Sequence, residues 1–266
     1  MCQYIINRHG RIKIMVRFML HGCNGKMGRM ITEIVKGEEN AVIAAGVDAF
    51  TGVPNDYPVF DSIEKCDTDV DVVIDFSNAK AVDGLLGYCV ERKLPVVLCT
   101  TGLSEEQLKK VEEASKEIAI LKSANMSLGI NLFLKLLQSA AKVLAPAGYD
   151  MEIVERHHNQ KLDAPSGTAL ALADAINETQ DPQYAYCFDR SQERKPREKR
   201  EIGISAVRGG TIVGEHEVLF AGEDEVIEFK HTAYSKAVFG KGALEAAKFL
   251  AGKPAGRYEM SDVISF

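Results

Sequence analysis

The sequence predicts an α/β protein of two domains, in which a doubly wound parallel sheet comes first and an α+β domain with a mixed open sheet follows. Short apolar runs alternate with segments of helical period up to about residue 127, whereas strand-like runs crowd together after about residue 150. The chain has 266 residues, enough for two domains at ~100 to 200 residues each.

The first domain is expected to consist of successive β–α–β units with parallel strands. The predicted strands are Val16–Leu20, Ala41–Val47, Val70–Phe76, Pro95–Leu98 and Ile118–Leu121. The predicted helices between them are Lys26–Lys36, Ala79–Arg92 and Glu105–Lys116. Ser104 and Gln107 form the pattern of a capping box before the last of these helices.

The second domain is expected to begin with a long helix over 128–145. Its predicted strands are Met151–Val154, Ile202–Val207, Thr211–Val213, Glu217–Phe220 and Val226–Lys230, interrupted by one helix over Thr168–Asn177. A final helix, Ala237–Ala251, is expected to pack back onto the first domain. The predicted boundaries are therefore 15–127 with 236–266 for the first domain and 128–235 for the second.

Residues 1–14 show no clear period. We expect them to form an N-terminal extension, a tail or an upstream start, and of the two candidate initiators Met1 and Met15 we favour Met15.

Composition narrows the function classes. The formal net charge of −6 argues against nucleic acid or an anionic membrane surface as a partner. The charged segment 189–201 mixes both signs, which favours a solvated loop. No apolar stretch reaches the ~18 residues of a membrane span. The six cysteines lie far apart without a CxxC pair, so we expect reduced thiols and a cytoplasmic protein.

A glycine-rich turn follows the first predicted strand. Gly22, Gly25 and Gly28 stand where a strand enters a helix. Backbone N–H groups at a helix N-terminus bind a pyrophosphate, and glycines let the backbone approach it closely. The turn therefore predicts a Rossmann-type dinucleotide-binding domain. The spacing is GxxGxxG rather than GxGxxG, and alone it also fits a tight turn without a ligand.

Other strand ends strengthen the prediction of a nucleotide site. Asp48 follows the second strand at the position where an acid hydrogen-bonds the adenosine ribose. Ser77, Thr100 and Thr101 follow later strands, although each is singly explained by a cap or a turn. Asn125 follows the last strand and is placed to orient a carboxamide. Asp48 favours NADH and Lys26 could tolerate NADPH, so both cofactors remain open.

The densest polar stretch runs from residue 155 to 168. His157, His158 and Lys161 could bind and protonate an anionic substrate. The helix start at Ser166, Gly167 and Thr168 suits a carboxylate, although Ser166 or Thr168 could be only an N-cap. The histidines could equally be surface residues. We expect no metal, because three or four ligands with suitable spacing are missing.

These motifs resemble the 4-hydroxy-tetrahydrodipicolinate (dihydrodipicolinate) reductase family of lysine and diaminopimelate biosynthesis, from about residue 15 onward. The stretch 155–169 resembles the family motif E-x-H-H-x-x-K-x-D-A-P-S-G-T-A. The segments 22–28, 73–77, 100–102, 124–127 and 213–216 also follow the family's order. The family transfers hydride from NADH or NADPH to a cyclic imine dicarboxylate, and it is typically a homotetramer assembled through the sheet of the substrate domain.

The resemblance also implies roles for individual residues. His157 matches the catalytic acid/base and Lys161 the proton donor, while His158, Gly167 and Thr168 match substrate-binding positions, to which the helix start adds Ser166. The implied dinucleotide contacts are Gly22, Cys23, Asn24, Gly25, Lys26, Met27, Asp48, Cys99, Thr100, Thr101, Ser123, Ala124, Asn125 and Met126.

The sequence departs from the family at Cys99, where glycine is common, and at Lys26, where arginine is frequent. Two alternatives therefore stay open. One is another nicotinamide dehydrogenase of the same layout, acting for instance on an amino acid or on an aldehyde, the latter with Cys99 as nucleophile. The other is a non-catalytic module that senses the ratio of NADH to NAD.

Overall fold

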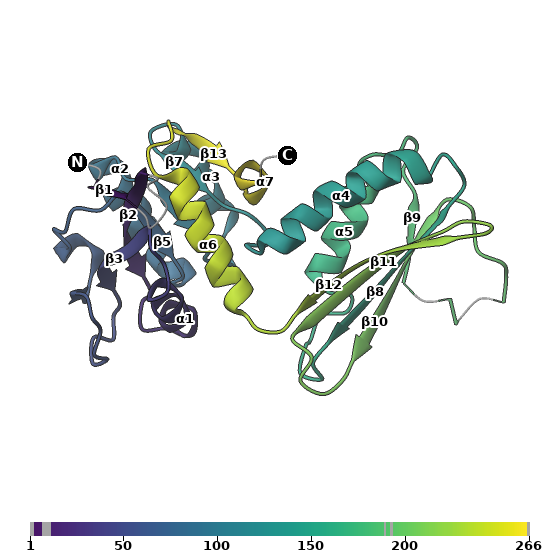
Figure 1. The fold of residues 1–266 in the computed structure, drawn as a ribbon, viewed down its shortest axis with the longest axis horizontal. Helices are drawn as coiled ribbons and strands as arrows, with labels where there is room; N and C mark the ends of the chain where they lie inside the picture. Colours follow the sequence, from purple (N-terminus) through teal and green to yellow (C-terminus); the bar gives the residue numbers. More distant parts are fainter. Residues whose placement is uncertain (1–2, 7–11, 189, 192–193, 265–266) are drawn as a thin grey trace. The chain divides into compact units, whose positions relative to one another are not determined.

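The protein divides into two compact units. The computed structural model describes residues 3–6, 12–188, 190–191 and 194–264, and Figure 1 shows their helices and strands. Unit 1 comprises Met1–Ser127 and Ala237–Phe266, and unit 2 comprises Leu128–Lys236. The chain thus leaves unit 1, completes unit 2 and then returns to unit 1.

Unit 1 is built on one sheet of mainly parallel strands. Its strand order is β13-β7-β6-β5-β2-β3-β4, and all neighbours along this path are parallel. The strands are β2 (Ile12–His21), β3 (Ala41–Val47), β4 (Val59–Phe60), β5 (Val72–Asp75), β6 (Val96–Leu98), β7 (Ala119–Leu121) and β13 (Gly256–Tyr258). The parallel sheet and its five expected strands are confirmed; the short strands β4 and β13 were not expected.

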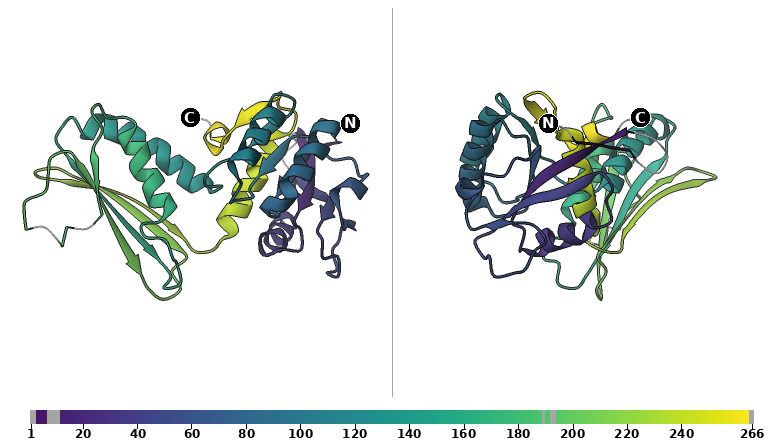
Figure 2. Two further views of the ribbon diagram at one scale, coloured as in Figure 1. Left: turned by 180° about the vertical axis from the view of Figure 1, so that it is seen from behind. Right: turned by 60° about the vertical axis from the view of Figure 1, so that its left-hand side comes forward.

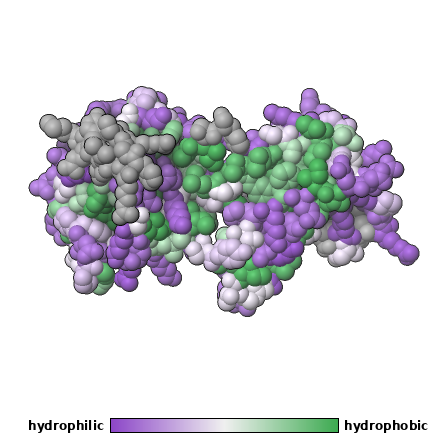
Figure 3. All heavy atoms as spheres, in the orientation of Figure 1, coloured by the Kyte–Doolittle hydropathy of each residue, from purple (hydrophilic) through white to green (hydrophobic). Residues whose placement is uncertain are grey.

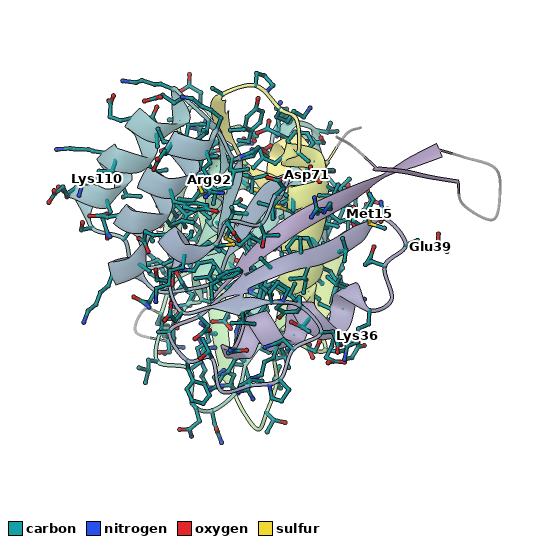
Figure 4. The ribbon with its side chains drawn as sticks, turned by 90° about the vertical axis from the view of Figure 1, so that its left-hand side faces the viewer. Met15, Lys36, Glu39, Asp71, Arg92 and Lys110 are labelled. Carbon is teal, nitrogen blue, oxygen red and sulfur yellow. The ribbon has the colours of Figure 1, made fainter. Side chains whose placement is uncertain are left out.

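Helices cover both faces of this sheet. Figure 4 shows one pair on either side: α1 with α6, and α2 with α3. The helices are α1 (Lys26–Val35), α2 (Val82–Arg92), α3 (Glu105–Ser115), α6 (Ala237–Leu250) and α7 (Met260–Val263), with 3-10 turns over Ile63–Lys65 and Ala79–Ala81. The predicted capping box is confirmed, since Ser104 Oγ accepts from Gln107 N at 3.2 Å and Gln107 Oε1 accepts from Ser104 N at 3.2 Å.

The strand order places a crevice at the carboxyl ends of β2 and β5. From β2 the chain moves outward through β3 and β4, then crosses to the other side of β2 and continues through β5, β6 and β7. The loops that leave β2 and β5 therefore turn to opposite faces of the sheet, and open α/β sheets bind ligands at this point.

The expected N-terminal extension contains a strand that the sequence did not predict. Strand β1 (Gln3–Ile6) pairs antiparallel with the start of β2, with Gln3 opposite Met15 and Ile6 opposite Ile12. Figure 4 shows this strand pair extending beyond Met15. The backbone hydrogen bonds of an antiparallel ladder form without any particular side-chain period, and the missing period therefore did not indicate the pairing.

Unit 2 combines two helices with a mixed five-stranded sheet. The strand order is β12-β11-β8-β10-β9, parallel among β8, β10 and β9 and antiparallel from β8 through β11 to β12. The strands are β8 (Asp150–His157), β9 (Ala185–Cys187), β10 (Glu201–Arg208), β11 (Gly214–Ala221) and β12 (Val226–Ala233). Figure 2 shows α4 (Leu128–Leu144) and α5 (Gly167–Asn177) on one face of this sheet. The mixed sheet is confirmed, but the strand expected at Thr211–Val213 is wrong, because β11 begins only at Gly214.

One face of the unit 2 sheet supplies the core. Met151 and Ile153 on β8 and Val218 and Phe220 on β11 are fully buried with residues of α4 and α5. Along both strands buried and half-buried residues alternate, as expected for a sheet covered on one side. Leu132, Leu136 and Val143 on α4 are exposed apolar residues. Figure 3 shows an apolar patch over this helix.

In the described part of the chain, no helix is long and apolar enough to cross a membrane. The five cysteines of that part, Cys23, Cys66, Cys89, Cys99 and Cys187, are free. Cys2 lies outside the described residues.

Candidate active site

Unit 1 contains a cavity of about 490 Å³ at the carboxyl ends of β2, β3 and β5. Its lining comes from these strand ends and from the segments that follow β4 and β5. The lining residues are His21, Gly22, Gly25, Val47, Asp48, Ala49, Asp61, Ser62, Ile63, Glu64, Phe76, Ser77, Asn78, Lys80, Ala81 and Gly84. The cavity lies at the point of the strand order where ligands bind in sheets of this kind.

The glycines of the turn after β2 are required by close backbone contacts. Gly22 has φ +82°, and a Cβ on it would lie 2.6 Å from the carbonyl oxygen of Phe76. A Cβ on Gly28 would lie 2.2 Å from the carbonyl oxygen of Gly22. Gly25 is the N-cap of α1 and has no side chain to cap the first amides. This backbone cradle, with the helix N-terminus behind it, fits a pyrophosphate.

Asp48 joins the end of β3 to this turn. Its Oδ2 accepts from the backbone N–H of Asn24 at 2.9 Å and its Oδ1 from that of Phe50 at 3.0 Å. A carboxylate has about four acceptor positions. Asp48 therefore keeps acceptor capacity toward the cavity that it lines, as a ribose ligand needs.

A buried group of polar side chains beneath the turn joins Thr100, an expected cofactor contact, to Asp75 and His21, to which the sequence assigned no function. Asp75, at the end of β5, is fully buried. It accepts from Thr100 Oγ1 at 2.6 Å and from Ser77 N at 3.2 Å, and its Oδ1 lies 2.8 Å from His21 Nδ1. These bonds connect the carboxyl ends of β2, β5 and β6. The Thr100 hydroxyl is thereby engaged in structure.

The other expected cofactor residues lie near the same edge of the sheet but do not line this cavity. Cys23 and Asn24 are buried, Lys26 is exposed and Met27 is half-buried. Residues 99–101 follow β6, and residues 123–126 follow β7, so both segments begin at the carboxyl ends of parallel strands. Asn125 Oδ1 accepts from Ser127 N at 2.9 Å. Of the fourteen expected contacts, Gly22, Gly25 and Asp48 are brought together in the cavity.

The two cysteines among these residues are not activated thiols. Burial and the nearby Asp75 carboxylate raise the pKa of Cys99 well above its ordinary value. Burial and Asp48 raise the pKa of Cys23 to about 11. Both thiols are protonated at neutral pH, and a nucleophilic role requires the thiolate.

Unit 2 holds a second polar site at the end of β8, around Glu155 and His157. Both continue the buried row formed by Met151 and Ile153. Glu155 is fully buried, with a relative exposure of 0%. Its Oε2 lies 2.6 Å from His157 Nδ1. Arg208 on β10 donates to both oxygens of this carboxylate, at 2.7 and 2.8 Å.

His216 and Ser166 extend this network. His216 lies opposite Glu155 on β11, its ring 5.2 Å from that of His157. Its Nε2 lies 3.0 Å from Ser166 Oγ, which also caps α5 by accepting from Ala169 N at 3.1 Å. The Ser166 N–H donates to Glu155 Oε1 at 3.0 Å. Burial and the nearby His157 lower the pKa of His216 to about 4, so this ring is neutral at pH 7.

The remaining substrate-site candidates lie in the segment between β8 and α5. Lys161 Nζ forms an ion pair with Asp163 Oδ1 at 2.8 Å, and this bond lowers the pKa of Asp163. His158 is half-buried, directly after the last residue of β8. Gly167 and Thr168 begin α5, as expected. The structure therefore brings His157, Lys161 and the start of α5 into one region of unit 2.

Three contributors to this site were missed from the sequence: the roles of Glu155, Arg208 and His216. Arg208 on β10 is the cross-strand neighbour of His157, and His216 on β11 is the cross-strand neighbour of Glu155. Only the strand register brings these residues together. Glu155 and His157 continue the period-two row of Met151 and Ile153, and this was the available signal for Glu155. Within the described ranges, no group of three or more His, Cys, Asp or Glu is arranged to hold a metal ion.

Family models match almost the whole chain. The model described as "Dihydrodipicolinate reductase, N-terminus" matches residues 16–126, and the one described as "Dihydrodipicolinate reductase, C-terminus" matches residues 129–264. The chain belongs to the dihydrodipicolinate reductase family. The family resemblance noted in the sequence is therefore confirmed.

Individual members of the dihydrodipicolinate reductase family agree. A 4-hydroxy-tetrahydrodipicolinate reductase of Caldanaerobacter subterraneus subsp. tengcongensis is 53% identical, covering 94% of this chain and 99% of its own. One of Clostridium tetani is 51% identical, covering 96% and 99%. The solved structure of a dipicolinate-bound dihydrodipicolinate reductase from Paenisporosarcina sp. TG-14 has a TM-score of 0.80 at 25% identity, covering 94% of this chain and 100% of its own.

Proposed function

We propose that the protein reduces 4-hydroxy-tetrahydrodipicolinate to tetrahydrodipicolinate with NADH or NADPH, in lysine and diaminopimelate biosynthesis. The observation that carries the proposal is the identity of 53% to a reductase of this name over nearly the full length of both chains. The glycine cradle of unit 1 and the polar network of unit 2 are consistent with the two ligands that this reaction needs.

Unit 1 is proposed to be the dinucleotide-binding domain, over 15–127 and 236–266. The backbone of Gly22 to Met27 would hold the pyrophosphate, and Asp48 the adenosine ribose. The segments Cys99–Thr101 and Ser123–Met126 would contact the nicotinamide half. When bound, the nicotinamide supplies a hydride.

Unit 2 is proposed to be the substrate-binding and oligomerisation domain, over 128–235. Lys161 and the amides that begin α5 would bind the substrate carboxylates, with His158, Ser166, Gly167 and Thr168 in this site. Lys161 would exchange its ion pair with Asp163 for one with the substrate. His157 would act as acid/base and Lys161 as proton donor.

A direct assay tests the proposal. The substrate is generated from pyruvate and aspartate semialdehyde, and the purified protein is added with NADH or with NADPH. We expect loss of the reduced-nicotinamide absorbance with at least one cofactor. Absence of oxidation with both would refute the proposed reaction, and tight cofactor binding without turnover would favour the sensor alternative.

The aldehyde dehydrogenase alternative is disfavoured by the raised pKa of Cys99. Replacing this residue by serine decides between the two enzymes. A reductase, in which Cys99 contacts the cofactor but forms no bond to substrate, keeps its kcat in Cys99→Ser, whereas an enzyme with a thiol nucleophile loses it.

We further propose a homotetramer in the cytoplasm. The unit 2 sheet has helices on one face, while its other face carries exposed residues such as Val207 and Val226. A sheet face that no helix covers and that carries exposed apolar residues is suited to association with a second copy of the chain. Size-exclusion chromatography with light scattering measures the mass of the assembly directly. A mass of 29.1 kDa, that of the monomer, would contradict the tetramer.

A further inference from the structure

The Glu155 carboxylate has all of its acceptor positions occupied. Its Oε1 accepts from Arg208 Nη2 at 2.7 Å and Ser166 N at 3.0 Å. Its Oε2 accepts from Arg208 Nη1 at 2.8 Å and lies 2.6 Å from His157 Nδ1. A carboxylate offers about four acceptor positions, so the Glu155 carboxylate has no position left for a further donor. The short distance to the His157 ring is typical of a hydrogen bond to a charged group.

This carboxylate is ionised. Burial alone raises the pKa of Glu155, but the hydrogen bonds from Arg208, His157 and Ser166 outweigh burial and bring the pKa below its ordinary value. An ionised carboxylate accepts hydrogen bonds and donates none. The hydrogen between Glu155 and His157 therefore belongs to Nδ1 of the ring, and in the neutral imidazole Nε2 is the nitrogen with the free lone pair.

Nε2 of His157 faces a residue without a side chain. A Cβ on Gly214, the first residue of β11, would lie 3.1 Å from His157 Nε2. Gly214 is not at a positive φ, so the backbone at this position accepts other residues. Glycine at position 214 is therefore explained by its proximity to His157 Nε2 and not by the backbone conformation of a turn.

The other titratable side chains around the His157 ring come from β11, β12 and the segment before α5. His216 on β11 meets it edge to face at 5.2 Å and is neutral at pH 7. His231 lies opposite His216 on β12. Lys161 and Asp163, from the segment before α5, pair with each other, and Asp163 O accepts from Arg208. The ionised partner in contact with the ring is Glu155.

We propose that Glu155 and Arg208 are positioning residues that hold His157 in the Nδ1–H tautomer, so that Nε2 is the atom that exchanges a proton, with Gly214 keeping its approach open. This inference rests on the proposed function. During the reduction the Nε2–H bond of the imidazolium breaks, its electron pair stays on the nitrogen, and the proton passes to the substrate. The Nδ1–H bond to Glu155 remains intact throughout.

The tautomer is measurable without substrate. Nitrogen NMR of the full chain labelled at histidine distinguishes a protonated from a bare ring nitrogen, and His157→Gln identifies the resonances. In the neutral ring we expect Nδ1 protonated and Nε2 bare. A neutral ring with the hydrogen on Nε2 overturns the proposal. Because this readout needs no turnover, it remains decisive even if the reductase assay fails.

Variants test the positioning directly. We expect Glu155→Gln to lower kcat by about 10²-fold, with a smaller change in KM, and to mix the two tautomers. Glu217→Gln, the same substitution on β11 at a carboxylate that pairs with Arg156, should preserve both rate and tautomer. A folded Glu155→Gln protein with normal kcat and a single Nδ1–H tautomer refutes the role of Glu155.

Gly214→Ala tests the space beside Nε2 without changing any charge. We expect kcat to fall several-fold while the Nδ1–H tautomer persists. Gly209→Ala is the matched control, because a Cβ at Gly209 meets nothing within 4 Å. Equal rates in the two variants contradict the role of Gly214, and this pair remains informative if Glu155→Gln fails to fold.

Discussion

In unit 1 the candidate ligand site is made largely of backbone, whereas in unit 2 it is made of side chains from three strands. The turn after β2 works through what Gly22 and Gly28 lack, since a Cβ on either would meet main-chain atoms. The network around His157 works through charge, because a buried carboxylate is matched by a guanidinium. The first kind of site is sensitive to added volume, and the second is sensitive to lost charge.

The largest effect is expected from removing the guanidinium of unit 2. Arg208→Met leaves the buried Glu155 carboxylate without its ionic partner, and we expect the free energy of unfolding to fall by about 3–5 kcal/mol. Urea unfolding measures the change. The control, Arg156→Met, breaks a half-exposed pair with Glu217 and should cost only ~0–1 kcal/mol. An equal fall in the free energy of unfolding in Arg208→Met and Arg156→Met would show that the burial of Glu155 does not determine the loss of stability.

The chemistry of the same network provides the second test. His157→Gln should lower kcat by about 10²- to 10⁴-fold, because it removes the acid/base while leaving ligand contacts. Lys161→Ala should lower kcat and also raise KM, because its ammonium binds a carboxylate. Steady-state kinetics with both cofactors measures this difference. An unchanged rate in His157→Gln would exclude this residue from the mechanism.

Added volume is the corresponding test in unit 1. Gly28→Ala places a Cβ 2.2 Å from the Gly22 carbonyl oxygen, so we expect a loss of about 2–3 kcal/mol in stability together with weaker cofactor binding. Thermal unfolding and a cofactor titration measure the two effects. Gly87→Ala, in α2 with nothing within 4 Å of the added methyl, should be neutral or stabilising. A fully stable Gly28→Ala protein would mean that the turn is not closely packed.

The buried histidine of unit 2 predicts a pH dependence. The pKa of His216 falls from its ordinary 6.5 to about 4 on folding. Above pH 6.5 both folded and unfolded states hold the neutral ring; below it the unfolded state gains a proton first, so stability falls. The contribution of His216 to the loss from pH 6.5 to 5 should be about 2 kcal/mol, and this part should disappear in His216→Gln. The contribution of His231, whose pKa is also lowered by burial, should remain. Urea unfolding at both pH values checks this, with His158→Gln as control; an unchanged pH dependence in His216→Gln would contradict it.

The smallest effect concerns the cofactor. Asp48→Asn removes a negative charge from the cavity at the proposed ribose position, and the ratio of kcat/KM for NADPH to that for NADH should rise about 5-fold, which corresponds to ~1 kcal/mol. Asp69→Asn, an exposed carboxylate outside the cavity lining, should leave the ratio unchanged. The same ratio in both variants would argue against contact between Asp48 and the adenosine ribose.

Much of unit 1 was predictable because its information is local. The strand Ala41–Val47 was predicted with the observed ends, and Ser104 with Gln107 marked the start of α3 correctly. The spacing of Gly22 and Gly28 indicated a close turn, and the structure shows the contact. The strands β4 and β13 were missed because two or three residues at a sheet edge carry too little periodicity.

The network of unit 2 was less predictable because it depends on register between distant strands. Glu155 and Arg208 are 53 residues apart, and Ser166 and His216 are 50 apart. No local pattern states that β8 pairs with both β10 and β11. The sequence motif identified His157 and Lys161 through the family resemblance, but the groups that surround His157 required the strand order.

The return of residues 237–266 to unit 1 affects how the molecule is made. During synthesis from the N-terminus, unit 2 is one uninterrupted segment, and all of its strands are available before α6 has been translated. Unit 1 receives α6 and its edge strand β13 only afterwards. Domains generally fold as units. Unit 1 is therefore the first unit whose synthesis begins and the last whose synthesis is completed, and its sheet cannot be complete until the end of the chain has been made.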